Sequence, residues 1–214
     1  MKIYDLGITE YTDALQFQRD LVRKRRTGEI SDALILVEHD PVVTISRLTD
    51  RNHITNSSFF DSKNIPVLVT DRGGEITFHC PGQMVMYPII DLRDKKRDIA
   101  FYIDFLEKTA VKSLGRIGID AERMQGRRGV WVNNKKIGFI GIRLKQWVTF
   151  HGIAININND IIPFLHINPC GQKNVRVTSA KEYLGKTIDM SVVKKVFAEQ
   201  FNKDLNAEYG LLLI

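Results

Sequence analysis

The residues of this chain that could carry chemistry are a cysteine, a lysine and two histidines, each close to glycine or proline. Cys170 lies between Pro169 and Gly171 at the end of an apolar segment. Proline fixes the entry to that turn, and glycine leaves bare backbone beside the sulfur. A structural cysteine more often lies inside a periodic apolar run. The spacing alone leaves a nucleophilic and a structural Cys170 equally open.

A cysteine nucleophile needs a partner, because only a few per cent of a free thiol is ionised at neutral pH. The possible helpers are His79, His151, Lys135 and Lys136. Adjacent lysines on a strand point to opposite faces, so only one of the two lysines can serve the site. The alternatives are a solvated lysine and histidines that only fix loops. Two glycines in the strand from Lys136 to Gly141 predict a groove on the sheet for a ligand tail.

The stretch Arg72–Gln83, with the sequence RGGEITFHCPGQ, is the strongest local sign of a binding site. It contains three glycines, a proline, a histidine and the second cysteine, and it lies between the expected strands 66–70 and 84–87. A loop of this composition lets backbone approach a ligand closely. A glycine-rich hairpin without a ligand is the alternative.

Other kinds of site are not indicated by the sequence. His79, Cys80, His151, His166 and Cys170 do not show the paired spacing of zinc ligands. No glycine-rich run ends in Gly-Lys-Ser/Thr, as a phosphate-binding loop requires. We therefore expect no metal and no cofactor. The two cysteines fall in different motifs, which predicts no disulfide framework and a cytoplasmic location.

Composition predicts one soluble domain spanning residues 1–214. Apolar residues make up 43% and charged residues 26% of the 214 residues, which is typical of globular proteins. No apolar run is long enough to cross a membrane. The N-terminal residues MKIYDLGITEY are not a signal peptide, since Asp5, Gly7 and Glu10 interrupt their apolar character.

The net charge of +6 leaves three classes of partner, namely nucleic acid, an anionic membrane surface and an acidic protein. Basic residues gather at 23–26, at 93–97 and at 123–128. No nucleic-acid-binding motif accompanies them, and aromatic residues are not interleaved with the basic runs. An ordinary solvated surface accounts for most of these charges individually.

The elements that must position these residues alternate irregularly between strand and helix. We expect helices at 9–26 (capped by Thr9), at 98–118 (capped by Asp98) and at 191–206. The buried apolar run Ala33–Val37 predicts a strand covered on both faces. Asn133-Asn134 predicts a hairpin turn. Further strands are expected at 2–7, 42–45, 129–132, 136–144, 147–158 and 209–214, and 51–63 is expected to be loop with one helical turn. The pattern favours an α+β fold, a mixed sheet with helices on one side.

Several of these motifs together resemble one known family. RGGEITFHCPGQ resembles the RGGxxTxHGPGQ motif of the octanoyl-[acyl carrier protein]:protein N-octanoyltransferases, also called lipoate-protein ligase B. The segment Leu36–Thr44 is similar to the family's LLEHPPVYT. The match continues, in the family's order, through 129–141, 147–156 and 167–171. The resemblance covers most of the chain from about residue 33 to 179.

The resemblance implies the fold of the biotin and lipoate protein ligases, a mixed sheet flanked by helices, and a two-step acyl transfer. Cys170 would take octanoyl from octanoyl-acyl carrier protein as a thioester. A lysine of a lipoyl domain, in a 2-oxoacid dehydrogenase complex or the glycine cleavage H protein, would then receive it. No nucleic acid, membrane or cofactor is implied, and we expect a monomer. An acidic carrier protein or lipoyl domain would suit the basic surface.

The resemblance also assigns roles to individual residues. Lys136 matches the lysine that partners the catalytic cysteine. Its ammonium would favour the thiolate, and after acylation the amine could accept the proton of the attacking lysine. The positions matching the family's substrate-binding segments are Arg72, Gly73, Gly74, Glu75, Ile76, Thr77, Phe78, His79, Phe139, Ile140, Gly141, Gly152, Ile153 and Ala154.

Two positions depart from the family pattern, and two other functions stay open. Cys80 and Ser46 stand where the family usually has glycine, and a side chain there could crowd the pocket. A residue before proline favours extended geometry, which cysteine tolerates, so we expect accommodation. The alternatives are an ATP-dependent lipoate or biotin ligase of the same fold and a non-catalytic basic binding module.

Overall fold

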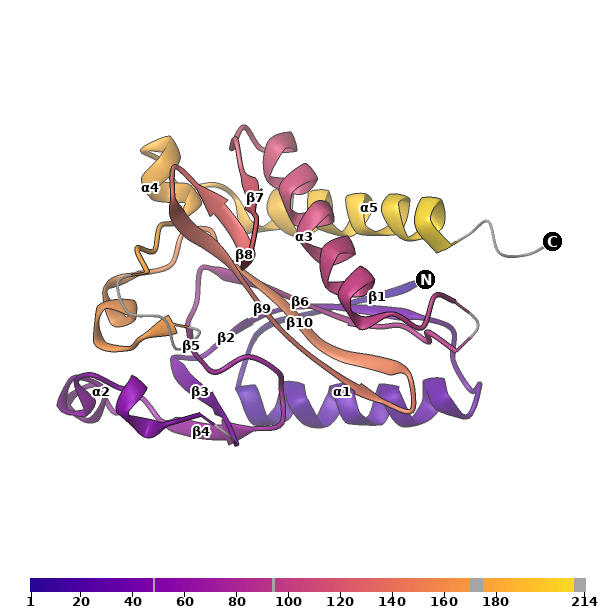
Figure 1. The fold of residues 1–214 in the computed structure, drawn as a ribbon, viewed down its shortest axis with the longest axis horizontal. Helices are drawn as coiled ribbons and strands as arrows, with labels where there is room; N and C mark the ends of the chain where they lie inside the picture. The colour runs from indigo at the N-terminus through magenta and orange to yellow at the C-terminus, as the bar shows by residue number, and fades with distance from the viewer. Residues whose placement is uncertain (48, 94, 170–174, 210–214) are drawn as a thin grey trace.

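A seven-stranded mixed sheet forms the centre of the molecule in the computed structural model, which describes residues 1–47, 49–93, 95–169 and 175–209 (Figure 1). The strand order is β1-β2-β6-β10-β9-β8-β7. β1 pairs with β2 in parallel, and the other neighbours are antiparallel. The strands are β1 (Lys2–Thr9), β2 (Ala33–His39), β6 (Gln83–Ile89), β7 (Glu122–Met124), β8 (Arg127–Val132), β9 (Lys135–Lys145) and β10 (Val148–Asn156).

Helices cover both faces of this sheet (Figure 1). On one face, α1 (Tyr11–Arg26) packs Ala14, Leu21 and Val22 against β2, β6 and β10. On the other, α3 (Ile99–Arg116) and α5 (Met190–Tyr209) form the larger core. The expectation of helices on one side is therefore wrong, and the mixed sheet flanked by helices is confirmed. All seven residues of β2 are buried, so apolar cover was required on both of its faces.

A second sheet of three strands, β4-β3-β5, lies beside the first and packs against α2 (Ser57–Ser62) and the short helix η2 (Ile162–His166). Its strands are β3 (Val42–Ser46), β4 (Val67–Thr70) and β5 (Ile76–His79). The stretch Arg72–Gln83 is thus not only loop. Ile76 and Phe78 enter a core cluster while Thr77 and His79 face a cavity, as the two-residue period of a strand requires.

Most of the expected local elements are present. Asp98 caps α3 by accepting a hydrogen bond from the Phe101 backbone N–H at 3.0 Å. Asn133 and Asn134 form the β8–β9 turn with φ of 49° and 61°. The predicted cap at Thr9 is wrong, because its hydroxyl donates to the Leu6 carbonyl while Glu10 occupies the cap position.

The remaining chain is short elements and ends. The 51–63 region contains a turn of 3-10 helix, η1 (Arg51–His53), besides α2, and α4 (Ala180–Leu184) was not expected. Of the final strand expected at 209–214, Tyr209 ends α5 and the rest lies outside the described residues. No helix in the described part of the chain has the length and hydropathy of a membrane span.

Candidate active site

A pocket lies between the α1 face of the large sheet and the small sheet. Its walls come from elements far apart in the sequence. The stretch 72–79 supplies one wall, and β9 and β10 supply the opposite one. Tyr11 of α1 and Val85 and Tyr87 of β6 complete the lining. The side chains are mostly apolar, with polar groups at a few places.

Backbone rather than side chain forms the wall at two glycines of the paired strands β9 and β10. Gly141 faces Gly152 across the ladder. A Cβ added to Gly141 would lie 2.6 Å from the Gly73 carbonyl oxygen, and one on Gly152 would lie 2.1 Å from the Met86 oxygen. The Gly73 N–H donates to the Ile142 carbonyl at 2.8 Å. The stretch after β4 therefore rests directly on β9, as close backbone approach requires.

The expected open groove at Gly138 and Gly141 is not what the structure shows. The place of a Gly138 side chain is filled by Ile155 and Val130, and that of Gly141 by the Gly73 backbone. The pocket is lined instead from Phe139 onward. The strand was predicted correctly, but the sequence of one strand does not show whether other chain segments fill the space above its glycines.

Arg72 holds the glycine-rich wall in place. Its side chain is buried and donates from Nε to the Thr44 hydroxyl at 3.0 Å and from Nη2 to the Thr44 carbonyl at 2.7 Å. Nη2 also donates to the Glu75 carbonyl, and Nη1 to the Gly73 carbonyl. These bonds tie both ends of the 72–75 turn to β3. A buried guanidinium used in this way is a fixed positive wall of the pocket.

Three of the five histidines are buried next to the pocket, with two tyrosines between them. Ring centroids of Tyr11 and His79 are 5.9 Å apart, those of His39 and His79 5.5 Å, and those of Tyr87 and His151 6.1 Å. Burial lowers the pKa of all three imidazoles, that of His39 to about 4. All three are therefore neutral at pH 7.

His151 sits in a strained backbone conformation with φ of 54°, which non-glycine residues rarely adopt. The Gln18 side chain of α1 accepts its N–H at 2.8 Å, and its Nε2 lies 3.1 Å from Asp71 Oδ1. The hydrogen bond from His151 and the charge of Arg19 lower the pKa of Asp71 to about 2, despite its partial burial. The carboxylate therefore accepts from Nε2–H, and Nδ1 keeps its lone pair.

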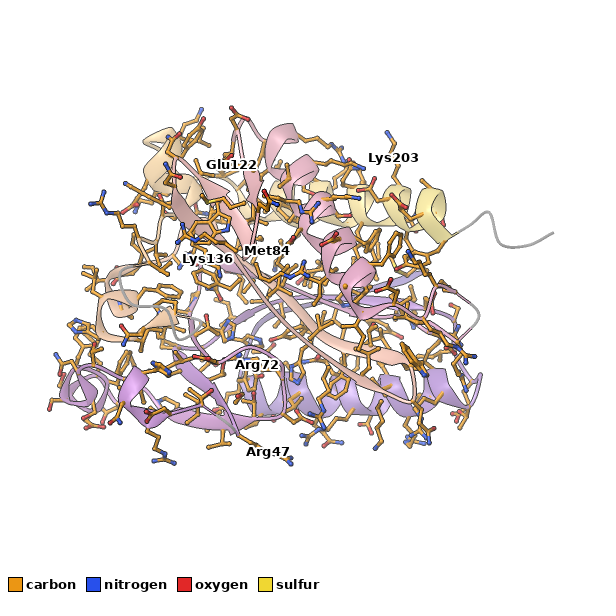
Figure 2. The ribbon with its side chains drawn as sticks, in the orientation of Figure 1. Arg47, Arg72, Met84, Glu122, Lys136 and Lys203 are labelled. Carbon is orange, nitrogen blue, oxygen red and sulfur yellow. The ribbon has the colours of Figure 1, made fainter. Side chains whose placement is uncertain are left out.

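Lys136 is buried, with 3% of its surface exposed, whereas Lys135 is exposed. The predicted opposite orientation of the two lysines is confirmed. The Lys136 ammonium donates to the Arg128 carbonyl at 2.9 Å and lies 5.2 Å from the ring centre of Phe139. Phe139 lines the pocket, so Lys136 adjoins one end of it. Figure 2 marks Lys136 beside β8 and Arg72 closer to α1.

Cys170 lies outside the described residues, but the chain on either side of it is placed. Ile167 packs in the same cluster as Phe139, and Val177 packs against that cluster. The Lys136 N–H donates to the Arg176 carbonyl at 2.7 Å. The segments before and after residues 170–174 thus both lie beside Phe139. A nucleophilic Cys170 stays a prediction.

The structure brings twelve of the fourteen predicted binding residues together around the one pocket. The exceptions are Phe78, which packs in the core, and Gly73, whose backbone lies behind the wall on β9. Their role in binding stays a prediction. The pocket-lining residues that the motifs did not indicate are Tyr11, Val85 and Tyr87, because only tertiary contacts bring them there.

The two departures from the family pattern are accommodated away from the pocket lining. Cys80 is buried in the cluster around Phe78, and burial raises the pKa of its thiol to about 12. Its sulfur is 3.9 Å from the Asp160 carbonyl oxygen. The Ser46 hydroxyl forms a hydrogen bond with the Thr49 hydroxyl at 2.9 Å, and Ser46 lines a neighbouring hollow. Among the described residues, no three His, Cys, Asp or Glu side chains form a group that could hold a metal.

Comparison with known proteins agrees with this arrangement. The model of the lipoyl protein ligase A/B catalytic domain matches residues 10–202. An octanoyltransferase of Rubrobacter xylanophilus is 41% identical over 202 residues, which cover 93% of this chain and 90% of that protein. One from Alkaliphilus metalliredigens is 39% identical, covering 96% and 97%.

Solved structures share the fold at lower identity. A lipoate-protein ligase A bound with ATP superposes with a TM-score of 0.79 at 14% identity, covering 96% of this chain and 85% of that one. Biotin protein ligase from Aquifex aeolicus, in complex with biotin and ATP, gives 0.61 at 13% identity, covering 98% and 72%. These likenesses establish the architecture of the sheet and helices.

Proposed function

Because this chain belongs to the lipoyl protein ligase A/B catalytic domain family and is an acyltransferase, we propose that it transfers octanoyl from octanoyl-acyl carrier protein to a lysine of a lipoyl domain. Cys170 is the proposed nucleophile and Lys136 its partner. The observation that carries the proposal is a largely apolar pocket that begins at Phe139, beside the buried ammonium of Lys136.

The pocket suits an unbranched acyl chain. Strand β9 advances about 16 Å from Lys136 to Gly141, at about 3.3 Å per residue. Its residues Phe139 to Gly141 line the pocket. Burying the seven carbons beyond the carbonyl would contribute about 6 kcal/mol, at about 0.8 kcal/mol per carbon. Gly141 and Gly152 close this part of the wall with backbone, because the Gly73 and Met86 carbonyls fill the places that their side chains would take.

In the first step, the Cys170 thiolate attacks the carbonyl carbon of the octanoyl thioester. The bond to the phosphopantetheine sulfur breaks, and that sulfur leaves as a thiolate and takes up a proton. In the second step, the amine of the acceptor lysine attacks the new thioester. An amide forms, the amine loses a proton and the Cys170 thiolate is released. One thioester is exchanged for another before the downhill amide step, so ATP is not required.

Lys136 supports both steps in this proposal. As an ammonium it stabilises the thiolate by charge. After acylation it can, in the amine form, receive the proton of the attacking lysine. The bond from Nζ to the Arg128 carbonyl fixes its direction.

The proposed acceptors are lipoyl domains of 2-oxoacid dehydrogenase complexes and the glycine cleavage H protein. The proposed location is the cytoplasm, where reducing conditions keep Cys170 a thiol. The proposal takes the carrier protein and the lipoyl domains to be acidic. Three basic residues lie near the end of the pocket next to Lys136 and form no ion pair among the described residues; they are Arg127, Lys135 and Arg176. These charges would attract an acidic partner.

The test is intact-mass measurement after incubation with octanoyl-acyl carrier protein and no ATP. We expect a mass gain of one octanoyl group in the unmodified sequence and in Cys80→Ser, and none in Cys170→Ser. Addition of a lipoyl domain should discharge the adduct and acylate one lysine.

Two other outcomes would replace the proposal. No adduct without ATP, together with product from octanoate and ATP, would assign the chain to ATP-dependent ligation. No turnover under either condition would leave a basic binding module.

A further inference from the structure

A chain of buried hydrogen bonds joins the pocket to the segment beside Lys136, through two side chains that the steps above do not use. Gln83 and Asn156 are fully buried. Gln83 Oε1 lies 2.6 Å from His79 Nδ1, and Gln83 Nε2 donates to Asn156 Oδ1 at 2.9 Å. Asn156 Nδ2 donates to the Thr178 carbonyl at 3.0 Å.

Backbone carbonyls fix the direction of every bond in this chain, because a carbonyl can only accept. The Thr178 oxygen requires the amide nitrogen of Asn156, so Asn156 Oδ1 must accept from Gln83 Nε2. The same nitrogen of Gln83 donates to the Phe78 carbonyl at 3.1 Å. Gln83 Oε1 is left as an acceptor, so His79 must donate from Nδ1–H.

The far end of the chain reaches the backbone of Lys136. The Thr178 N–H donates to the Lys136 carbonyl at 3.0 Å, and the Lys136 N–H donates to Arg176 at 2.7 Å. Thr178 is therefore bonded on one side to Asn156 and on the other to Lys136. At the near end, His79 lines the pocket, and its remaining polar ring atom is Nε2.

We propose that Gln83 and Asn156 are positioning residues for the acyl transfer. Gln83 fixes His79 as the Nδ1–H tautomer, so that its Nε2 is an acceptor toward the pocket. Asn156 fixes the segment 176–178 against Lys136 and sets the position of the lysine relative to the acyl chain. This inference rests on the proposed function for its kinetic consequence, although the hydrogen-bonded unit can be tested without it.

Asn156→Asp is the sharpest variant, and Asn158→Asp is its matched control. Aspartate at 156 still accepts from Gln83 but cannot donate to the Thr178 carbonyl, and it places negative charge beside that oxygen. Asn158 makes a comparable tie, with Nδ2 to the Ile188 carbonyl at 2.7 Å and Oδ1 to the Ile188 N–H at 3.0 Å. The same chemical change there loosens a segment that does not contact Lys136.

Two measurements need no catalytic activity. Two-bond ¹H–¹⁵N spectra of the imidazoles should show His79 as Nδ1–H in the unmodified protein and in Asn156→Asp, and as a tautomer mixture in Gln83→Leu. Amide exchange at Thr178 should be about tenfold faster or more in Asn156→Asp, the equivalent of about 1.4 kcal/mol. It should be unchanged in Asn158→Asp.

The kinetic expectation is a selective loss of kcat. Asn156→Asp should lower kcat about tenfold or more with KM little changed, because misplacement of a reacting group costs rate rather than binding. Asn158→Asp should change neither. An Nε2–H tautomer in the unmodified protein, or equal exchange and kinetic effects in the two aspartate variants, would overturn the inference.

If Asn156→Asp does not fold, amide exchange at Thr178 and kcat are measured in Asn156→Ser instead. The tautomer of His79 is measured in the unmodified protein and does not depend on either variant. Should the unmodified protein transfer no octanoyl group, the proposed function fails, while the tautomer and exchange results still decide whether the unit exists.

Discussion

At the scale of single residues, Lys136 and Lys135 differ in burial although they are neighbours in the sequence. Lys136 donates to the Arg128 carbonyl and contacts Phe139, whereas Lys135 is exposed. We expect Lys136→Ala to slow single-turnover transfer from a small octanoyl-pantetheine donor by about a hundredfold or more. Lys135→Ala should stay close to the unmodified rate with this donor, because no carrier protein has to dock. Equal effects would exclude the proposed pairing.

His39 makes a second prediction at this scale, on stability against pH. Its ring is buried between the Thr9 carbonyl, 2.9 Å from Nδ1, and the Tyr87 hydroxyl, 2.8 Å from Nε2. The folded pKa of about 4 lies below the unfolded value of about 6.5. As the pH falls through this window the unfolded chain binds the proton first, so the free energy of unfolding decreases, by about 3 kcal/mol at pH 4.

Urea unfolding between pH 4 and 7 measures this contribution. His39→Gln removes the titrating ring and should flatten the dependence of the unfolding free energy on pH. The unmodified protein, measured over the same pH range, is the reference for this slope. An unchanged slope in His39→Gln would show that other groups dominate this pH range.

At the scale of elements, the contact between the 72–75 turn and β9 depends on glycine. An alanine Cβ at Gly141 would lie 2.6 Å from the Gly73 oxygen and 3.2 Å from Arg72 Cδ. We expect Gly141→Ala to displace this turn, to cost about 1–3 kcal/mol of stability and to raise KM for the acyl donor. Gly115→Ala is the control, because nothing lies within 4 Å of a Cβ there.

Gly115 lies inside α3, where alanine is the better helix former. The control variant should therefore be more stable than the unmodified protein by about 0.5–1 kcal/mol, with KM unchanged. Thermal unfolding and steady-state kinetics of both variants measure the two effects. A normal KM in Gly141→Ala would show that the turn does not shape the site.

The sequence was sufficient for elements whose signal is local. The cap at Asp98 and the turn at Asn133-Asn134 are set by side chains next to them in the chain. β5 was not predicted, because its four residues stand between Gly73-Gly74 and Pro81-Gly82, which favour a loop. The cover of the sheet on both faces was implied by the wholly buried β2, but which helix covers which face depends on long-range packing.

The site was predictable to a similar degree. The motifs contain most of the residues that line the pocket, since each motif lies on one strand or turn. Tyr11 and Tyr87 come from α1 and β6, whose local patterns give no sign of a site. The pair Gln83–Asn156 likewise forms only when β6 and β10 are neighbours.

At the scale of the whole molecule, much of the basic charge is neutralised within the protein. Arg25 pairs with Asp32 and Asp91, and Arg93 also pairs with Asp91. Arg123 pairs with Asp104 and Glu107. The clusters seen in the sequence therefore overstate the basic surface. The basic residues around the Lys136 end differ, since Lys135 and Arg176 are exposed there.

Association with an acidic carrier protein should therefore depend on salt. We expect kcat/KM for octanoyl-acyl carrier protein to fall severalfold as ionic strength rises beyond about 0.1 M, where charges more than about 10 Å apart are screened. With octanoyl-pantetheine as donor, kcat/KM should change little. A parallel loss with both donors would point to an effect on the site itself and not on docking.

The backbone wall at Gly141 and Gly152 has a consequence for redesign of the enzyme. An engineer who wants a different acyl length cannot enlarge these positions by trimming a side chain, and any addition meets the carbonyls of Gly73 or Met86. The adjustable positions are on the opposite wall and on β6, where Thr77 and Val85 carry side chains into the lining. A library restricted to those two positions would sample chain-length preference and leave the strand pairing intact.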